Sequence, residues 1–310
     1  MIPNLACPSC GTSVEQAWPG LVAPFIAEYV LLKAVASCRL MECEICQHRF
    51  FDHVFTGAEL ERLYAGYRGP AYFKARHKHE PWYTEAYNLG IGHAPDRVAL
   101  RKDALSVFLH AAGLNAPLGK VLDFGGDSGQ LIPEAAAQER FVYDMSDVPA
   151  VEGVEKLRRE ADLEGRTFDL ILLSHVLEHA PDPLGLLIQV RRLLPPMGGH
   201  IYVEVPLERP WTGLLGRGRG TSWFLERLRC QPRLLQLVDF YSSAFRVKAG
   251  FYPPLGFPKL HEHLHFFSRE SLQKLLGRAG LQSSNLQSVS SLGKGRPDAL
   301  AFLAEPTSRG

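Results

Sequence analysis

The chain has 310 residues, of which 46% are hydrophobic and 22% are charged, an ordinary composition for a globular protein with a sizeable core. A formal net charge of +1 excludes a global field that attracts nucleic acid, and short basic clusters such as Arg217-Gly-Arg219 are typical of solvated faces. The most apolar stretch, Leu21 to Leu40, is interrupted by Pro24, Glu28 and Lys33, so it does not qualify as a membrane span. No signal peptide pattern is visible at the N-terminus, and we expect a cytoplasmic protein.

Five of the six cysteines precede residue 47, and four of them form two C-x-x-C pairs, Cys7-Pro-Ser-Cys10 and Cys43-Glu-Ile-Cys46. Two such pairs supply four thiolates, the ligand set of a tetrahedral structural zinc ion. The long spacing between the pairs is acceptable because loop entropy grows slowly with loop length. Unligated reduced thiols are the main alternative, and a redox disulfide is disfavoured because neither pair lies in a βαβ pattern. Weaker ligand candidates are Cys38, His48 and His53.

We therefore predict a zinc-binding module over residues 1–60. Residues 61–94 follow as an aromatic and basic linker, dense in Tyr, Arg and His between Tyr64 and Tyr87. This composition predicts that the linker packs the module onto the rest of the protein and contributes to a pocket. The third part, residues 95–306, begins with a helical pattern from about Ala94 to Ala112 that ends at Gly113.

From Lys120 onward, strand-like runs alternate with helix-like runs, which predicts βαβ units, a parallel sheet and an α/β fold. Strands are expected at residues 120–124, 141–143, 151–154, 168–173 and 200–205, with helices at 131–138 and 183–194. Residues 207–260 break this rhythm with Trp, Gly and Pro, and we interpret them as a partly helical insertion after the fifth strand that covers the site of a bound acceptor molecule. A helix at 268–280 and two antiparallel strands at 282–289 and 299–304 are expected to complete the sheet.

A glycine-rich turn lies between the first strand and the helix expected after it, in the run Val121-Leu-Asp-Phe-Gly-Gly-Asp-Ser-Gly129. Glycines in such a turn let the backbone approach a ligand closely, and Asp144 ends the next strand, where a carboxylate accepts hydrogen bonds from ribose hydroxyls. Asp123 lies two positions before Gly125. A carboxylate there is repulsive beside a pyrophosphate but favourable beside an ammonium group.

At these residues the chain resembles class I S-adenosylmethionine-dependent methyltransferases. The resemblance covers residues 120–304 and includes Asp123 to Gly129, Tyr143-Asp144-Met-Ser146, the run Phe168-Asp…Val176-Leu-Glu-His179, and the late segment from Glu262 to Leu281. It implies a Rossmann-like seven-stranded methyltransferase sheet. One departure is Asp127, where the family often has glycine. The cysteine module also resembles zinc-binding regions ahead of some sugar- and polysaccharide-pathway methyltransferases.

The resemblance implies S-adenosylmethionine as cofactor and places several residues around it. The predicted cofactor-binding residues are Asp123, Gly125, Gly126 and Gly129 at the methionyl part, Asp144 at the ribose, Met145 at the adenine, and Ser174 near the methyl group. The predicted metal ligands are Cys7, Cys10, Cys43 and Cys46. The acceptor is expected to be a sugar or another small metabolite.

Histidines supply the candidate catalytic groups, because a base is needed when the acceptor carries a proton. His179 is the leading base, with His175 at the end of the fourth strand and His263 in the run His261-Glu-His-Leu-His265 as further candidates. In an extended segment His261, His263 and His265 share one face. This arrangement allows a second metal site, an active-site role or structural hydrogen bonds. Two alternatives stay open: an inactive methyltransferase-like interaction protein, and a nicotinamide-dependent oxidoreductase, which explains Asp123 and the 176–179 run poorly.

Overall fold

The computed structural model describes residues 5–90, 94–115, 118–134, 137–290 and 297–307. The chain divides into two compact units. Unit 1 contains residues up to Cys7, Gly11–Asn88 and Glu208–Phe266, and unit 2 contains Pro8–Cys10, Leu89–Leu207 and the chain from Phe267 onward. No helix among the described residues is long and apolar enough to cross a bilayer.

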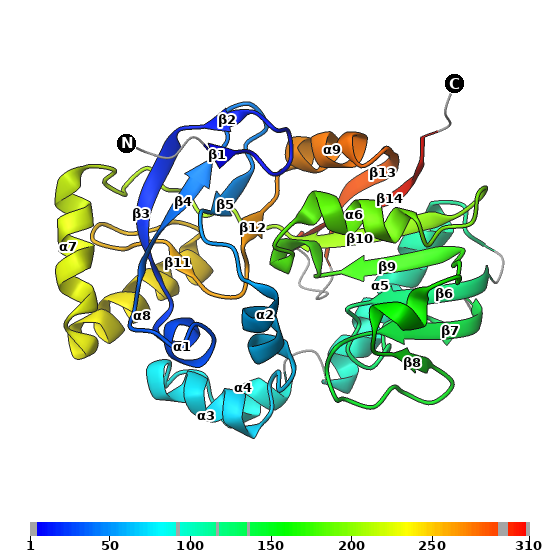
Figure 1. Ribbon diagram of the computed structural model, residues 1–310, viewed down its shortest axis with the longest axis horizontal. Coiled ribbons are helices and arrows are strands. Elements are labelled where there is room, and N and C mark those ends of the chain that lie inside the picture. The colour runs from blue at the N-terminus through cyan, green and yellow to red at the C-terminus, as the bar shows by residue number, and fades with distance from the viewer. Residues whose placement is uncertain (1–4, 91–93, 116–117, 135–136, 291–296, 308–310) are drawn as a thin grey trace. The chain divides into compact units, whose positions relative to one another are not determined.

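Unit 2 is built on a seven-stranded sheet with the order β13-β14-β10-β9-β6-β7-β8 (Figure 1). Its strands are β6 (Leu118–Phe124), β7 (Ala137–Tyr143), β8 (Glu155–Leu157), β9 (Leu170–Ser174), β10 (His200–Pro206), β13 (Leu281–Val289) and β14 (Ala299–Pro306). Neighbouring strands from β8 to β10 are parallel, whereas β14 runs antiparallel to both β10 and β13. This is the α/β, Rossmann-like sheet predicted from the sequence.

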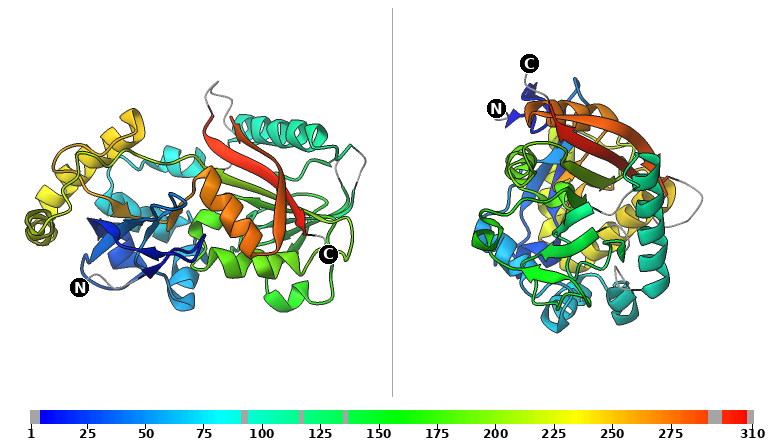
Figure 2. Two further views of the ribbon diagram at one scale, coloured as in Figure 1. Left: turned by 90° about the horizontal axis from the view of Figure 1, so that it is seen from above. Right: turned by 90° about the vertical axis from the view of Figure 1, so that its right-hand side faces the viewer.

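Helices cover both faces of this sheet, as Figure 2 shows. They are α5 (Pro95–Ala111), α6 (Pro183–Arg191) and α9 (Arg269–Arg278). One face packs Leu105 and Phe108 of α5 against Val121, Leu170 and Tyr202. The opposite face packs the apolar sides of α6 and α9, and both cores are buried. Strands covered on both faces must be apolar throughout, which explains the continuous Leu-Ile-Leu-Leu run of β9.

One predicted helix of unit 2 is wrong. Residues 126–132 form turns and bends rather than the start of a helix, and β7 already begins at Ala137, inside the range 131–138 expected to be helical. Residues 135 and 136 of that range lie outside the described part. Pro133 explains the outcome, because it lacks the N–H that a helix interior needs. The strand expected at 151–154 also lies later, at β8.

Unit 1 contains a five-stranded sheet with the order β11-β3-β4-β5-β12 and a two-stranded sheet, β1-β2. The strands are β1 (Leu5–Ala6), β2 (Ser13–Val14), β3 (Gln16–Val22), β4 (Ser37–Glu42), β5 (Arg49–Phe51), β11 (Lys259–Leu260) and β12 (His265–Phe266). Its helices are α1 (Pro24–Tyr29), α2 (Gly57–Tyr64), α3 (Pro70–His79), α7 (Arg219–Arg229) and α8 (Pro232–Ala249), and α4 (Glu85–Gly90) begins in this unit.

One edge strand of the five-stranded sheet, β11, ends the segment 207–260 that was predicted to be an insertion, and the other, β12, lies just after that segment. β11 pairs in parallel with β3, and β12 pairs antiparallel with β5. The close approach requires Gly20, where a β-carbon would lie 2.5 Å from the carbonyl oxygen of Pro258. This grouping differs from the predicted division into 1–60, 61–94 and 95–306, because two short strands join residues 208–266 to the N-terminal sheet.

Buried ion pairs also join two segments of unit 1, Gly11–Asn88 and Glu208–Phe266. Lys259 Nζ lies 2.8 Å from Glu80 Oε1 and 3.0 Å from Asp239 Oδ2, so β11 is fixed to the end of α3 and to α8. Arg76 and Tyr67 contact the carboxylate of Glu262 at 3.3 and 2.9 Å. Removing one member of such a buried network would leave an uncompensated charge, so these pairs fix one arrangement of the segments.

Candidate functional site

The glycine-rich turn follows β6 directly and holds the backbone in a left-handed conformation at alternate positions. The φ angles are 72° at Gly125, 55° at Asp127 and 72° at Gly129. Glycine adopts this region without steric cost, and Asp tolerates it better than most residues. Because no helix follows within residues 126–132, the N–H groups of this turn belong to the loop itself and not to a helix N-terminus.

Asp123 lies beneath this turn with 1% of its surface exposed. Among the described residues, its Oδ2 atom is buried and accepts no hydrogen bond. A β-carbon at Gly126 would overlap the Asp123 carboxylate, so only glycine lets the turn pass over this side chain. Burial raises the pKa of Asp123 to about 7, although the positive charge of Arg101 opposes this shift. A buried carboxylate with an unused oxygen is suited to a cationic ligand group.

Asp127, which stands where the family often has glycine, is held in place by local hydrogen bonds. Its N–H donates to Asp144 Oδ2 at 2.9 Å, and its Oδ1 accepts a hydrogen bond from Ser146 Oγ at 2.9 Å. The Lys156 ammonium donates to the Asp127 carbonyl oxygen at 2.6 Å. These bonds tie the turn after β6 to the loop after β7 and hold a non-glycine residue in the left-handed region.

Asp144 remains able to accept further hydrogen bonds in this arrangement. Each of its oxygens accepts one backbone N–H, from Asp127 at 2.9 Å and from Ser146 at 2.7 Å. A carboxylate offers about four lone-pair sites, so two remain for ligand hydroxyls. Met145 beside it is 51% exposed, so its side chain is accessible to a ligand.

A second group, the β9–β10 polar cluster, lies where β9 and β10 end. It consists of Arg101, Ser174, His175, Glu178, Tyr202 and Glu204. His175 Nε2 lies 2.8 Å from Glu204 Oε1, and its Nδ1 lies 3.2 Å from Glu178 Oε1. Arg101 Nη2 donates to Ser174 Oγ at 2.9 Å and lies 3.5 Å from Glu204 Oε1. Predicted residues Ser174 and His175 are therefore brought together with charged partners.

The two carboxylates determine the charge of His175. Burial by itself lowers the pKa of this imidazole, but the nearby carboxylates of Glu178 and Glu204 outweigh burial and raise the pKa to about 9. Burial likewise raises the pKa of Glu204, yet His175, Arg101 and Tyr202 together lower it to about 2. The pair is thus ionic at neutral pH, and a protonated His175 donates hydrogen bonds but accepts no proton.

Sequence reasoning did not identify Arg101 or Glu204 as site residues. Glu204 had a visible signal, an acidic residue in the otherwise apolar core of the strand His200–Pro206, where a buried charge needs partners. Arg101 had none, because it stands on α5, outside every strand-end motif, and only the packing of α5 on the sheet brings it to Ser174.

The other two candidate bases lie in different units. His179 closes the short 3-10 turn Leu177–His179 in unit 2, with a 19% exposed side chain and its Nε2 atom 4.0 Å from Glu178 Oε1. His263 belongs to unit 1, where its Nδ1 lies 3.5 Å from Glu208 Oε2. Two neighbouring histidines also lie in unit 1. His265 is buried, and His261 Nε2 lies 3.4 Å from Glu80 Oε1.

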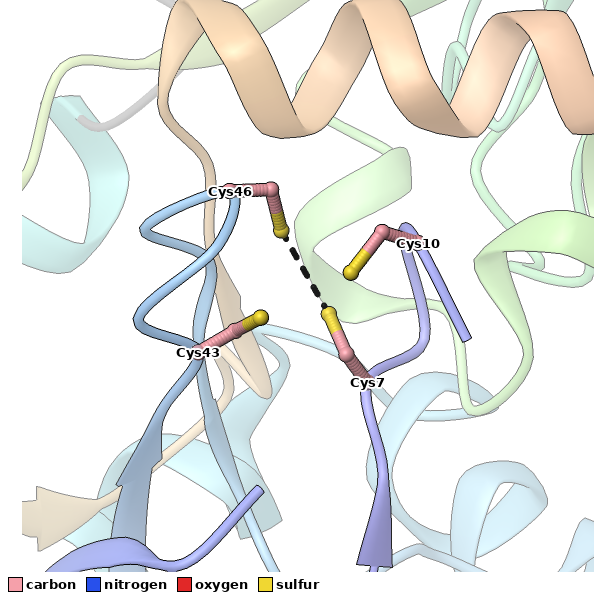
Figure 3. Close-up of side chains that lie close together, drawn as sticks. All are labelled: Cys7, Cys10, Cys43 and Cys46. Atoms are coloured by element: carbon pink, nitrogen blue, oxygen red, sulfur yellow. Dashed lines mark hydrogen bonds between the residues drawn. The ribbon is translucent and has the colours of Figure 1, made fainter. Parts of the chain in front are cut away.

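The four predicted metal ligands form one cluster, shown in Figure 3. Their sulfur atoms all lie within 4.8 Å of one another, and Cys7 Sγ is 3.5 Å from Cys46 Sγ. Four sulfurs bound to one zinc ion at about 2.3 Å lie roughly 3.8 Å apart, so the cluster has the dimensions of a tetrahedral site. Among the weaker candidates, His48 Nδ1 lies 4.0 Å from Cys7 Sγ, whereas Cys38 and His53 are not members of the cluster.

Two matching turns present these thiols. The N–H of Gly11 donates to the Cys7 carbonyl oxygen at 2.8 Å, and the N–H of Gln47 donates to the Cys43 carbonyl oxygen at 2.7 Å. Gly11 and Gln47 both have positive φ, 79° and 56°. The two C-x-x-C pairs therefore adopt the same local shape, and this shape points both thiols of each pair to one side, as Figure 3 shows.

Comparison with known proteins agrees with this geometry. A family model described as a methyltransferase domain matches residues 98–286, more than half of the chain, and the chain belongs to this family. No curated protein sequence matches the chain.

Three solved structures are among those similar to this chain. The 1,6-didemethyltoxoflavin-N1-methyltransferase of Burkholderia thailandensis is 16% identical, with 87% of this chain and 96% of that chain covered and a TM-score of 0.48. The magnesium protoporphyrin IX methyltransferase of Synechocystis is 13% identical, with 70% and 89% covered and a TM-score of 0.41. An S-adenosylmethionine-dependent methyltransferase of Clostridium acetobutylicum is 10% identical, with 74% and 98% covered and a TM-score of 0.42.

Proposed function

We propose that this chain transfers a methyl group from S-adenosylmethionine to a small-molecule acceptor, a sugar or another metabolite, in the cytoplasm. The observation that carries the proposal is Asp123, a buried carboxylate with an unused oxygen beneath a turn that only Gly126 permits. A methyltransferase domain needs a counter-charge for the ammonium group of its cofactor, and this carboxylate fits that need. A dinucleotide pyrophosphate would be repelled at the same place, which disfavours the oxidoreductase alternative.

In this proposal each residue of the turn has a defined task. The Asp123 carboxylate holds the ammonium group, while Gly125 and Gly129 let the backbone approach the methionyl chain. Asp144 accepts hydrogen bonds from the ribose hydroxyls with the lone pairs that Asp127 and Ser146 leave unused. The exposed side chain of Met145 packs on the adenine, and burying it there supplies apolar contact area.

The cofactor, when bound, supplies an electrophilic sulfonium methyl group, so the protein must chiefly place the acceptor atom in line with it. We assign to His175 the role of a protonated hydrogen-bond donor held by Glu178 and Glu204, and not that of a base. His179 is the proposed base: it would take the proton of an acceptor hydroxyl or amine as the bond from the acceptor atom to the methyl carbon forms and the bond from that carbon to the sulfonium sulfur breaks, with the neutral thioether as leaving group. His263 remains a further candidate of unit 1.

We further propose that Cys7, Cys10, Cys43 and Cys46 bind a structural zinc ion. The ion would join residues 7–10 to the β4–β5 connection, and four thiolates would leave no open position for a substrate. Its contribution is then to the folding of unit 1, since metal binding energy in such sites is folding energy.

The function is tested by incubating the zinc-loaded protein with isotopically labelled S-adenosylmethionine and separate pools of nucleotide-linked sugars, free sugars and other small metabolites. Mass spectrometry is expected to show labelled methyl transfer to a member of one pool, absent with Asp144→Ala. Cofactor binding without transfer to any pool would favour the alternative, a methyltransferase-like protein that serves in interactions. Binding of a nicotinamide cofactor instead would refute the proposal.

A further inference from the structure

The longest helix of unit 1 has its apolar side chains on the outside. Along α8 the buried residues are Leu235, Asp239 and Ser242. The residues that we define as the α8 outer face are large, apolar and exposed, from 39% at Tyr241 to 74% at Val247: Leu234, Leu237, Phe240, Tyr241, Phe245 and Val247. At 100° per residue these six positions occupy a sector of about 160°, opposite to the buried side.

On the inner side of α8, Leu235 packs in a buried apolar cluster with Leu21 and Phe257, and polar side chains make the other contacts. Asp239 Oδ2 lies 3.0 Å from Lys259 Nζ, and Ser242 Oγ accepts the N–H of Phe257 at 3.1 Å. The helix is thus anchored to β11 and the segment before it through an ion pair and a hydrogen bond. An ordinary surface helix has the opposite arrangement, with its apolar stripe on the core. The apolar outer face therefore calls for a partner, because exposed patches of this kind mark interaction sites.

The charge around this face indicates which partner. Residues 211–250 contain seven Arg and Lys residues but two acidic ones, a formal charge of +5 against +1 for the whole chain. Both acids are engaged in ion pairs, Glu226 with Arg229 and Asp239 with Lys259. Arg233 and Lys248 are exposed and fall within the same sector of α8 as the apolar residues.

Helix α7 precedes α8 and shares a buried cluster with it through Leu225 and Leu228. It also has exposed apolar and basic side chains. Trp223 is 63% exposed, and the guanidinium of Arg227 lies over its ring, 5.5 Å from the ring centroid. Exposed Trp, Phe and Leu together with Arg and Lys are the composition of helices that lie in a lipid headgroup region. Figure 2 shows α7 and α8 next to each other at one end of unit 1.

We propose that the α8 outer face, with the exposed side of α7, docks on the surface of an anionic lipid bilayer. The apolar side chains would enter the boundary between headgroups and acyl chains, and the basic side chains would contact anionic headgroups. A symmetric contact between two copies of the chain through this face would bring Arg233 and Lys248 of both copies together, which is repulsive, so charge favours the bilayer over a second copy. The inference does not depend on methyl transfer.

The test is co-sedimentation of the full chain with vesicles of phosphatidylglycerol and phosphatidylcholine, compared with vesicles of phosphatidylcholine alone, without any cofactor. We expect binding to the anionic vesicles that weakens as salt is added. Leu237→Gln/Val247→Gln is expected to weaken binding at least tenfold, and Arg233→Gln/Lys248→Gln to weaken it by about fivefold per residue. The matched control is Val107→Gln/Met197→Gln in unit 2, where the replaced side chains are 69% and 89% exposed.

Three results would each overturn the proposal, provided that circular dichroism shows every variant to be folded. The first is equal sedimentation of the wild type with both kinds of vesicle. The second is a concentration-dependent dimer, seen by analytical ultracentrifugation, that Leu237→Gln/Val247→Gln abolishes while vesicles bind no protein. Equal weakening by the control pair would also refute it, because the effect would then not belong to the α8 outer face.

Discussion

The imidazole of His175 and the carboxylate of Glu204 form an ion pair across two adjacent strands, with 2.8 Å between Nε2 and Oε1. His175 adopts a left-handed φ of 58°, and its N–H donates to the Glu204 carbonyl oxygen at 2.9 Å. Backbone and side chain thus bind the same partner. The pair fixes the end of β9, where the proposed base His179 follows four residues later.

Replacing Glu204 by Gln is expected to lower the pKa of His175 from about 9 toward its ordinary value, because one of two carboxylate partners is lost. The free energy of unfolding at pH 7 should fall by about 2 kcal/mol. The His175 contribution is complete below the unfolded pKa of about 6.5 and disappears as pH rises through about 9, so the difference from the wild type should shrink there.

Nuclear magnetic resonance titration of the His175 ring and denaturant unfolding between pH 6 and 10 measure the two effects. Glu139→Gln is the control, since that side chain is 57% exposed and lies 3.9 Å from Lys120. An unchanged His175 pKa in Glu204→Gln would show that the ion pair does not set the charge of this residue.

The affinity for S-adenosylmethionine should depend on pH through Asp123. Its pKa is raised to about 7 by burial, so the carboxylate that attracts the ammonium group is formed only as pH rises through that value. Between pH 6 and pH 8 the dissociation constant is expected to fall by about tenfold. Asp123→Asn should bind S-adenosylmethionine weakly at both pH values. A flat profile in the wild type would mean that Asp123 is not the counter-charge.

Gly126→Ala is expected to weaken cofactor binding at least tenfold, because the new methyl group overlaps the Asp123 carboxylate and must displace the turn. The control is Gly277→Ala within α9, where a β-carbon meets no atom within 4 Å. That change should leave binding intact and raise stability by about 0.5–1 kcal/mol through helix propensity. Titration calorimetry measures cofactor binding by the two variants, and thermal unfolding measures their stability. Equal binding by Gly126→Ala would contradict the proposed position of the ligand.

Zinc removal should loosen unit 1 and leave the sheet of unit 2 folded. We expect about one zinc ion per chain in the purified protein, reduced in Cys43→Ser and retained in Cys230→Ser, whose cysteine is exposed and outside the cluster. After chelation, limited proteolysis should cut within residues 5–88. Intact protease resistance combined with lost methyl transfer would assign the metal to chemistry instead of structure.

Much of the methyltransferase sheet could be predicted because each strand carries its own signal. The Leu-Ile-Leu-Leu run of β9 and the Gly-rich turn after β6 are local patterns with direct structural causes. The cysteine cluster was predictable for the same reason, since each C-x-x-C pair forms its own turn. Glycine turns of this type usually precede a helix, which is why a helix was expected at 131–138. The expectation is wrong because Pro133 lacks the N–H that a helix interior needs.

The composite nature of unit 1 was beyond sequence reasoning. It depends on β11 and β12, two strands of two residues each, which pair with β3 and β5 more than 200 residues earlier in the chain. Strands this short have no periodicity to detect. Arg101 was overlooked for a related reason: its role follows from where α5 packs, and no pattern around it in the sequence records that contact.

The measurement that tests the central claim most directly is calorimetric titration of the zinc-loaded protein with S-adenosylmethionine, with Asp144→Ala and Asp147→Ala beside the wild type. Asp147 lies in the same loop with an 86% exposed side chain and is the control. The account predicts binding near −8 kcal/mol, about micromolar, that is weakened tenfold or more in Asp144→Ala and unchanged in Asp147→Ala. Absence of binding by the folded wild type, or equal binding by all three proteins, would contradict it.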